Sequence, residues 1–143
     1  MRPLSWRHLV KVLSVVKLLL DRGAYIDACD KEGCNPLHGA CWNRQAPIAK
    51  LLLDRWCAIN AVDDYGYTPL HSACWNESKK YVQELLAHGA NVNIQNHAGT
   101  PLHIACMERS IECVQELLDH HTGTDIEIRK NHDDTPLLLA SCQ

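Results

Sequence analysis

Thr68-Pro69-Leu70-His71 is the stretch of sequence that decides the fold, because the same four-residue pattern returns along the chain. Versions of it stand at Asn35-Pro36-Leu37-His38, Thr100-Pro101-Leu102-His103 and Thr135-Pro136-Leu137-Leu138, with prolines 33, 32 and 35 residues apart. A further step of 33 residues toward the N-terminus reaches Pro3-Leu4. Self-similarity at a fixed period of about 20–50 residues indicates stacked repeats. The repeat therefore has to be recognised before any single helix is assigned.

Each repeated unit is predicted to hold two helices. Thr68 and Thr100 can cap a helix with their hydroxyls, and the proline after each suits the first helical position, where its missing N–H costs nothing. An alanine stands four residues past the proline of each of the last four motifs, and this small side chain would let neighbouring helices approach to about 8–10 Å. A second apolar stretch keeps the same phase, with paired leucines at Leu19-Leu20, Leu52-Leu53, Leu85-Leu86 and Leu117-Leu118. The second helices should end at Gly23 and Gly89 in left-handed caps.

This period and these motifs closely resemble the ankyrin repeat, from Pro3 to Gln143. The resemblance implies an all-α-type repeat solenoid, in which helix-turn-helix units stack and β-hairpin fingers project to one side. It also implies a concave face made by the first helices and the fingers. The family's glycine and histidine at the turn between the two helices are absent, so we expect looser turns at Arg44-Gln45, Glu77-Ser78 and Arg109-Ser110.

One domain is expected over residues 1–143, divided by the period into five units. Residues 1–29 are predicted to form a degenerate or partial first repeat, followed by repeats at 30–62 and 63–95. Residues 96–130 should form a repeat with a two-residue insertion around His121 and Thr122, and residues 131–143 a truncated last repeat. Because no second helix follows Pro136, we expect a fragment or short isoform of a longer array.

The composition excludes several classes of protein. Apolar residues make up 46% of the chain and charged residues 22%, as in a folded protein, and the net charge of −3 argues against nucleic acid as the main partner. Residues 1–20 are basic, but Lys17 interrupts their apolar stretch, so neither a signal peptide nor a membrane span is predicted. We expect an intracellular protein, in the cytoplasm or the nucleus.

Nine His and eight Cys raise the possibility of a metal or thiol-redox protein. Equivalent positions of neighbouring repeats lie about 8–10 Å apart, too far for one zinc ion or for a disulfide. The ladder of His38, His71 and His103 is instead expected to form hydrogen bonds around the Thr-Pro turn. The ladder of Cys41, Cys74 and Cys106, together with Cys113, should be core. We predict no metal site, no cofactor and no catalysis, and a thiol titration with a metal assay would test the redox or metal alternative.

The candidate binding residues lie six and seven residues past the prolines. Large apolar groups occupy the sixth position at Leu9, Trp42, Trp75 and Met107, and Asn43, Asn76 and Glu108 follow the last three. In ankyrin-like stacks this register faces the concave surface, and Trp is the residue most enriched at binding hot spots. Tyr65 and Tyr67 of the neighbouring finger are candidate partner contacts as well. As an alternative, Trp42 and Trp75 lie on the fingers against Tyr65 and Tyr67 and only cover structure.

These observations predict a non-catalytic protein–protein interaction module. Its partner would contact the apolar anchors Trp42, Trp75 and Met107, and would carry basic groups that approach the finger acids Asp30, Glu32, Asp63, Asp64, Asp133 and Asp134. The alternative is the recognition arm of an adaptor, because Ala105-Cys106 and Glu112-Cys113-Val114 resemble the ankyrin-repeat and SOCS-box family, although the sequence contains no SOCS box. The sequence does not predict an oligomeric state.

Overall fold

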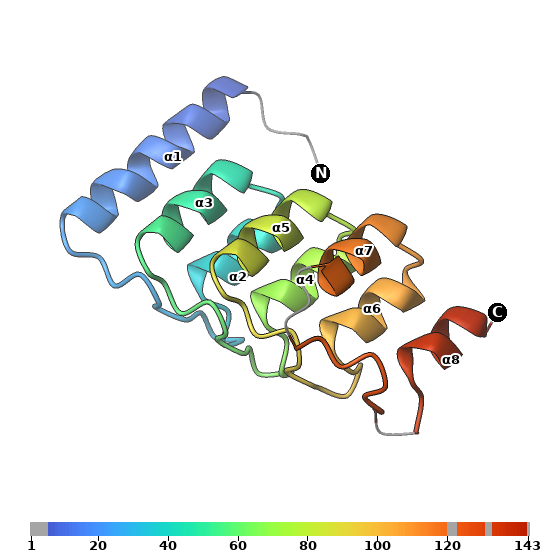
Figure 1. The fold of residues 1–143 in the computed structure, drawn as a ribbon. Coiled ribbons are helices and arrows are strands. Elements are labelled where there is room, and N and C mark those ends of the chain that lie inside the picture. Colours follow the sequence, from blue (N-terminus) through green and yellow to red (C-terminus); the bar gives the residue numbers. More distant parts are fainter. Residues whose placement is uncertain (1–5, 120–122, 131–132, 143) are drawn as a thin grey trace.

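The described residues of the computed structural model, 6–119, 123–130 and 133–142, form two layers of helices, and the side chains of residues 6–9 are not described. In chain order the helices are α1 (Trp6–Asp21), α2 (Pro36–Trp42), α3 (Ala46–Asp54), α4 (Pro69–Trp75), α5 (Lys79–Ala87), α6 (Pro101–Met107), α7 (Ile111–Asp119) and α8 (Pro136–Ser141). The even-numbered helices make one layer, the odd-numbered helices make the other, and the connecting fingers extend to one side (Figure 1). The predicted all-helical stack of paired helices is confirmed.

The even-numbered helices begin at the predicted prolines because a side chain caps each of them. Thr68 Oγ1 accepts a hydrogen bond from the backbone N–H of His71 at 3.3 Å, and the Thr68 N–H donates to His71 Nδ1 at 3.0 Å. Asn35 and His38 make the same reciprocal pair at the start of α2. Two backbone donors are thereby satisfied at the starts of α2 and α4, whereas at α8 Thr135 Oγ1 accepts from the Leu138 N–H alone.

The same histidines join each repeat to the next. Their Nε2 atoms lie 2.8–3.0 Å from backbone carbonyl oxygens of the following finger, in the pairs His38–Tyr67, His71–Gly99 and His103–Asp134. Because a carbonyl only accepts, Nε2 carries the proton, and Nδ1 is left to accept from the capping residue. The prediction that the histidines bond around the Thr-Pro turn is confirmed, and these bonds also hold the stack together.

The core is formed where the two layers meet. Leu37, Leu70 and Leu102 of the first layer meet Leu52, Leu85 and Leu117 of the second, and all six are buried. Cys41, Cys74 and Cys113 are fully buried among them, as predicted, whereas Cys106 is half-buried and packs against the core. Burial raises the pKa of Cys41 to about 12 and that of Cys74 well above its ordinary value, so both remain thiols.

The first unit departs from the predicted helix pair. A single helix, α1, runs for 16 residues and packs against α3, in line with the second helices of the other units (Figure 1). Val16 and Leu20 pack against the core, whereas Leu18 and Leu19 are exposed. No proline or glycine interrupts residues 6–21, so nothing in this sequence ends a helix there. The expected start at Pro3 lies outside the described residues.

The fingers hold no β-strand among the residues that the structure describes, which corrects the expected β-hairpins. An isolated bridge joins Asn96 and Gly99. The first two tips are instead closed by aspartates: Asp30 Oδ1 accepts from the backbone N–H groups of residues 32 and 34, and Asp63 Oδ1 from those of residues 65 and 67, at 2.8–3.0 Å. Such turns take up the whole tip, so too few residues are left for a ladder.

A second series of side chains links the bases of neighbouring fingers. Asp27 Oδ1 accepts from the Ala58 N–H at 2.7 Å, and Asn60 Oδ1 accepts from the Asn91 N–H at 2.8 Å. Asn93 Oδ1 continues the series by accepting from the N–H of residue 125 at 3.1 Å. The acceptors follow one another at 33 residues, the same period as the Pro motif. We call this series the finger ladder.

The turns between paired helices are closed rather than loose. Arg44, Glu77 and Arg109 adopt left-handed φ values of 55–58°, the conformation that glycine supplies most easily. The residue after each donates its N–H to the carbonyl of Ala40, Ala73 or Ala105 at 2.8–3.1 Å. The expectation of looser turns was wrong because these backbone hydrogen bonds form without the glycine.

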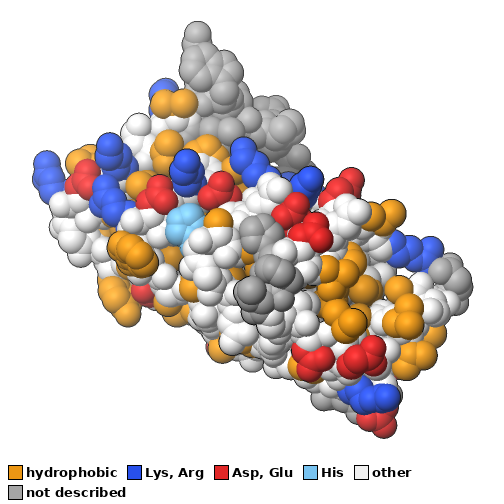
Figure 2. Space-filling view, viewed as in Figure 1, with side chains coloured by type: hydrophobic (Ala, Val, Ile, Leu, Met, Phe, Trp, Pro, Cys, Tyr) orange, Lys and Arg blue, Asp and Glu red, His pale blue; other side chains and the backbone are white. Residues whose placement is uncertain are grey.

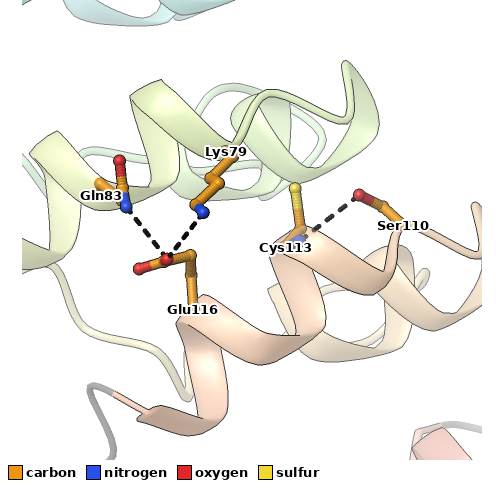
Figure 3. A network of polar contacts seen from close by, with 5 residues as sticks. All are labelled: Lys79, Gln83, Ser110, Cys113 and Glu116. Carbon is orange, nitrogen blue, oxygen red and sulfur yellow. Dashed lines mark hydrogen bonds and ion pairs between the residues drawn. The ribbon is translucent and has the colours of Figure 1, made fainter.

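Polar contacts also join neighbouring helices of the odd-numbered layer. Lys79 and Gln83 of α5 both point to Glu116 of α7, whose Oε1 lies 3.8 Å from Lys79 Nζ and accepts from Gln83 Nε2 at 3.0 Å (Figure 3). Nearby, the Cys113 N–H donates to Ser110 Oγ at 3.4 Å, at the start of α7 (Figure 3). The repeat at 96–130 is therefore joined to the repeat at 63–95 on this side as well as through the histidines.

Candidate functional site

A pocket of about 490 Å³ lies where α2 meets the first finger (residues 22–35) and the second finger (residues 55–68). We call it the finger pocket. It is lined by Asp30, Glu32, Cys34, His38, Gly39, Trp42, Asn43, Asp63, Tyr65, Tyr67 and Ser72. Four of the eight predicted partner residues are among these: Trp42, Asn43, Tyr65 and Tyr67. The other four, Trp75, Asn76, Met107 and Glu108, lie outside it.

Two accessible aromatic side chains dominate the pocket. Trp42, the last residue of α2, is 55% exposed, and Tyr65, at the tip of the second finger, is 63% exposed. Tyr67 is more enclosed, since its ring packs edge-on against His71 and His97 with centroids 5.7 and 5.8 Å away. Among the described residues no close ring pair joins Trp42 or Trp75 to either tyrosine. The geometry therefore favours accessible aromatics over the covering role that we considered.

Three carboxylates give the finger pocket a negative charge. Asp30, Glu32 and Asp63 line it, and none of its lining residues is Lys or Arg. The backbone N–H groups of Cys34 and Glu32 hold the pKa of Asp30 below its ordinary value, so this carboxylate is ionised at neutral pH. Three of the six finger acids that the sequence suggested as a partner's electrostatic target thus gather at one place, whereas Asp64, Asp133 and Asp134 lie outside the pocket lining.

Cys34 shows little of the chemistry expected of a redox or metal centre. Its Sγ donates toward Asp63 Oδ2 at 4.0 Å, and burial, followed by the neighbouring carboxylates, raises its pKa. Possible ligand atoms of Asp30, Glu32 and Cys34 lie within 4.8 Å of one another, but both carboxylates are exposed. A thiol that stays protonated is a weak nucleophile and a weak metal ligand. The geometry gives the redox or metal alternative little support.

Small residues open the pocket, and our sequence reasoning missed them. Gly39 of α2 and Ser72 of α4 stand three residues past their prolines, and a Cβ placed at Gly39 meets no atom within 4 Å. In α6 the same register holds Ile104, which is fully buried. The signal was present in the sequence as Gly, Ser and Ile at one register. Its meaning depends on which finger each position faces. Cys34 was missed as a pocket residue for the same reason.

The rest of the predicted stripe is unevenly accessible. Trp75, the last residue of α4, is 41% exposed, whereas Met107 and Glu108 are half-buried. Asn76 Nδ2 donates to the carbonyls of Cys41 and Trp42, both at 3.2 Å. The Asn76 amide therefore caps the C-terminal end of α2, which is a structural role in addition to the predicted contact with a partner.

An apolar surface lies at the other end of the stack. A groove of about 370 Å³ lies between α6, α7 and α8, lined chiefly by Cys106, Ile111, Val114 and Ala140. Leu137 and Leu138 of α8 are also exposed. Figure 2 shows hydrophobic side chains gathered over this end, whereas positive and negative side chains alternate over the outer helices. This groove carries few polar groups and thus differs in chemistry from the finger pocket.

Comparison with known proteins agrees with the architecture. The family model for ankyrin repeats in three copies matches residues 9–96 and 90–143, and no catalytic family was found. A search of curated proteins gave no match. None of the helices in the described part of the chain is long and apolar enough to cross a membrane. Ankyrin-repeat domains are typically protein–protein interaction modules and usually non-catalytic. With this match over most of its length, the chain belongs to the ankyrin-repeat family.

Proposed function

We propose that this chain binds a protein partner on the concave face, centred on the finger pocket. The observation that carries the proposal is the exposure of Trp42 and Tyr65 beside a pocket that no other part of the described chain fills. Trp and Tyr are enriched at binding hot spots because they bury a large apolar area and keep a polar atom for hydrogen bonding. Trp75 extends the same face along α4, and Met107 continues it in α6.

Polar groups around these anchors complete the proposed surface. Asn43 is exposed beside Trp42, while Asn76 and Glu108 occupy the same register in the next two repeats. Tyr67 forms a wall of the pocket. The acids of the fingers favour a partner with basic groups, because charge complementarity speeds association and disfavours acidic competitors. We expect no nucleic acid and no cofactor to take part.

Replacing both tryptophans tests this proposal. In the Trp42→Ala/Trp75→Ala variant, the free energy of unfolding should change by about 1–2 kcal/mol, since the side chains are 55% and 41% exposed and neither belongs to the buried core. Partner capture from cell extract should be lost, because hot-spot truncations cost about 2 kcal/mol or more each. Urea titration and quantitative mass spectrometry of the captured proteins provide the two readouts.

Leu85→Ala is the matched control. Leu85 is buried in α5, so its truncation should cost about 2–5 kcal/mol of stability without a specific loss of recognition while the protein stays folded. If the double Trp variant unfolds, the two rings belong to the structure. If it stays folded and keeps every partner, the binding surface lies elsewhere and the proposal fails.

A further inference from the structure

We propose that the finger pocket binds the guanidinium group of an arginine that the partner presents. This inference rests on the proposed function and names the chemistry that the pocket recognises. It follows from three features of the pocket: accessible aromatic faces, a negative charge with no Lys or Arg in the lining, and depth supplied by a glycine.

The aromatic faces suit a flat cation. A guanidinium is planar and weakly hydrated, so it stacks on Trp or Tyr rings at little cost in lost water. Cation–π attraction contributes about 0.5–1 kcal/mol at exposed sites and acts within about 6 Å of the ring centre. Trp42 and Tyr65 offer accessible rings from two different elements, α2 and the second finger. An ammonium group would keep more of its water and stack less well.

The charge of the pocket excludes other occupants. An apolar or acidic side chain would displace water from Asp30, Glu32 and Asp63 without replacing their hydrogen bonds, which is costly for carboxylates. Arginine offers five N–H donors in a fixed fork, which can serve carboxylates on two sides of the pocket at once. The carboxylates therefore select a cation with several donors.

The depth of the pocket explains why it occurs at this repeat. Gly39 leaves open space, and Ser72 is small, so a long side chain can enter between α2 and the fingers. At the equivalent position of the repeat at 96–130 stands Ile104, a larger side chain that is fully buried. The volume of about 490 Å³ accommodates an arginine side chain and part of the backbone that carries it.

Short peptides test the proposal directly on the full chain. We would titrate isotope-labelled protein with acetyl-Gly-Gly-Arg-Gly-Gly-amide and follow the backbone amide and Trp indole resonances by NMR. The Arg peptide should shift signals of Gly39, Trp42 and Tyr65 with millimolar affinity, as befits a single side chain. The same peptide with citrulline, a neutral isostere, should bind about tenfold or more weakly. The Lys peptide should bind several-fold more weakly than the Arg peptide, and salt at about 0.5 M should weaken both.

Two variants separate the pocket from the rest of the surface. Gly39→Leu should abolish the shifts by filling the pocket, and because an added Cβ meets no atom there the fold should remain. Glu32→Gln should weaken Arg binding several-fold. Glu32 is preferred to Asp30 and Asp63 because those carboxylates also hold backbone turns. Glu127→Gln, an equal loss of charge at an exposed position outside the pocket, should leave Arg binding unchanged.

Distinct outcomes overturn the two proposals. Equal affinity for the citrulline and Arg peptides would refute arginine recognition and leave the partner-binding face standing. Arg-induced shifts confined to residues outside the pocket, or no shifts at about 10 mM peptide, would also refute it. If the wild-type protein binds the Arg peptide but the Trp42→Ala/Trp75→Ala variant still captures every partner, the proposed function would instead be refuted.

Discussion

Trp56 is an unusual residue for its position. It follows α3 with a φ of 60°, where Gly23 and Gly89 follow α1 and α5 with φ of 90° and 85°. The side chain is 90% exposed, so little packing offsets a left-handed conformation that costs about 1–2 kcal/mol for a bulky residue. Glycine loses more conformational entropy on folding than tryptophan does, and this loss offsets about half of the gain. Trp56→Gly should therefore raise the free energy of unfolding by about 1 kcal/mol, measured by urea titration.

The reverse exchange provides the control. Gly89→Trp places the same side chain at the end of α5, where an added Cβ meets no atom within 4 Å, and it should lower stability by a similar amount. A loss of stability in Trp56→Gly would show that the indole contributes contacts, for example with Leu53 and Ile59, which line the same shallow surface pocket.

Residues whose partners lie close in sequence were the predictable ones. The cap of α4 needs only Thr68, Pro69 and His71, all within four positions, so local chemistry was sufficient to place it. The finger pocket instead brings together Cys34 and Ser72, which are 38 positions apart and belong to different repeats. Spacing alone does not show which small residue faces which finger. Cys34, Gly39 and Ser72 therefore emerged as pocket residues only from the structure.

Among the first-layer helices α2, α4, α6 and α8, the last is the most weakly anchored. Pro136 is its one buried residue, whereas the first five residues of α6, Pro101 to Ala105, are all buried. Local opening is easiest where few apolar contacts are lost, so α8 should open at a lower free energy than α6. Hydrogen exchange should show protection factors about tenfold or more lower in α8 than in α6. Helix α4, as short as α6 and equally enclosed, is the control. Equal protection in all three would mean that α8 is firmly docked.

The elements that the sequence misjudged share a physical cause. In the first unit, Val12, Val16 and Leu20 pack against the core as a second helix would. No proline or glycine separates them from the preceding residues, so α1 is one continuous helix. In the fingers, the family resemblance suggested strands, whereas Asp30 and Asp63 turn the chain within a few residues. Both errors concern where an element stops, which depends on competition between neighbouring segments. The starts of α2, α4, α6 and α8 depend on local caps and were predicted correctly.

At the scale of the molecule, histidines link successive repeats, so stability should depend on pH. Burial lowers the pKa of His71 to about 4 and lowers that of His103 as well. The folded state therefore binds fewer protons than the unfolded state between about pH 4 and 6.5. Stability should be full above about pH 6.5 and should fall on acidification toward pH 4, with His71 alone contributing on the order of 3 kcal/mol. Urea titrations at several pH values in this range measure the slope.

The His71→Gln variant isolates this contribution from that of the carboxylates. Glutamine can still donate toward the Gly99 carbonyl but does not take up a proton, so the fall in stability between pH 7 and 4.5 should be smaller than in the wild type. An unchanged slope in His71→Gln would contradict a role for the buried imidazole in the acid response.

The finger ladder has a consequence for how such a protein can change over generations. Asp27, Asn60 and Asn93 each hold the next finger through a backbone N–H, a donor that every residue except proline offers. Any unit that keeps an Asp or Asn at this register can therefore follow any other unit. Duplication or exchange of whole units by recombination would leave the joints intact, while residues such as Trp42 and Trp75 diverge. The length of the array and the choice of partner are thereby open to selection independently of each other.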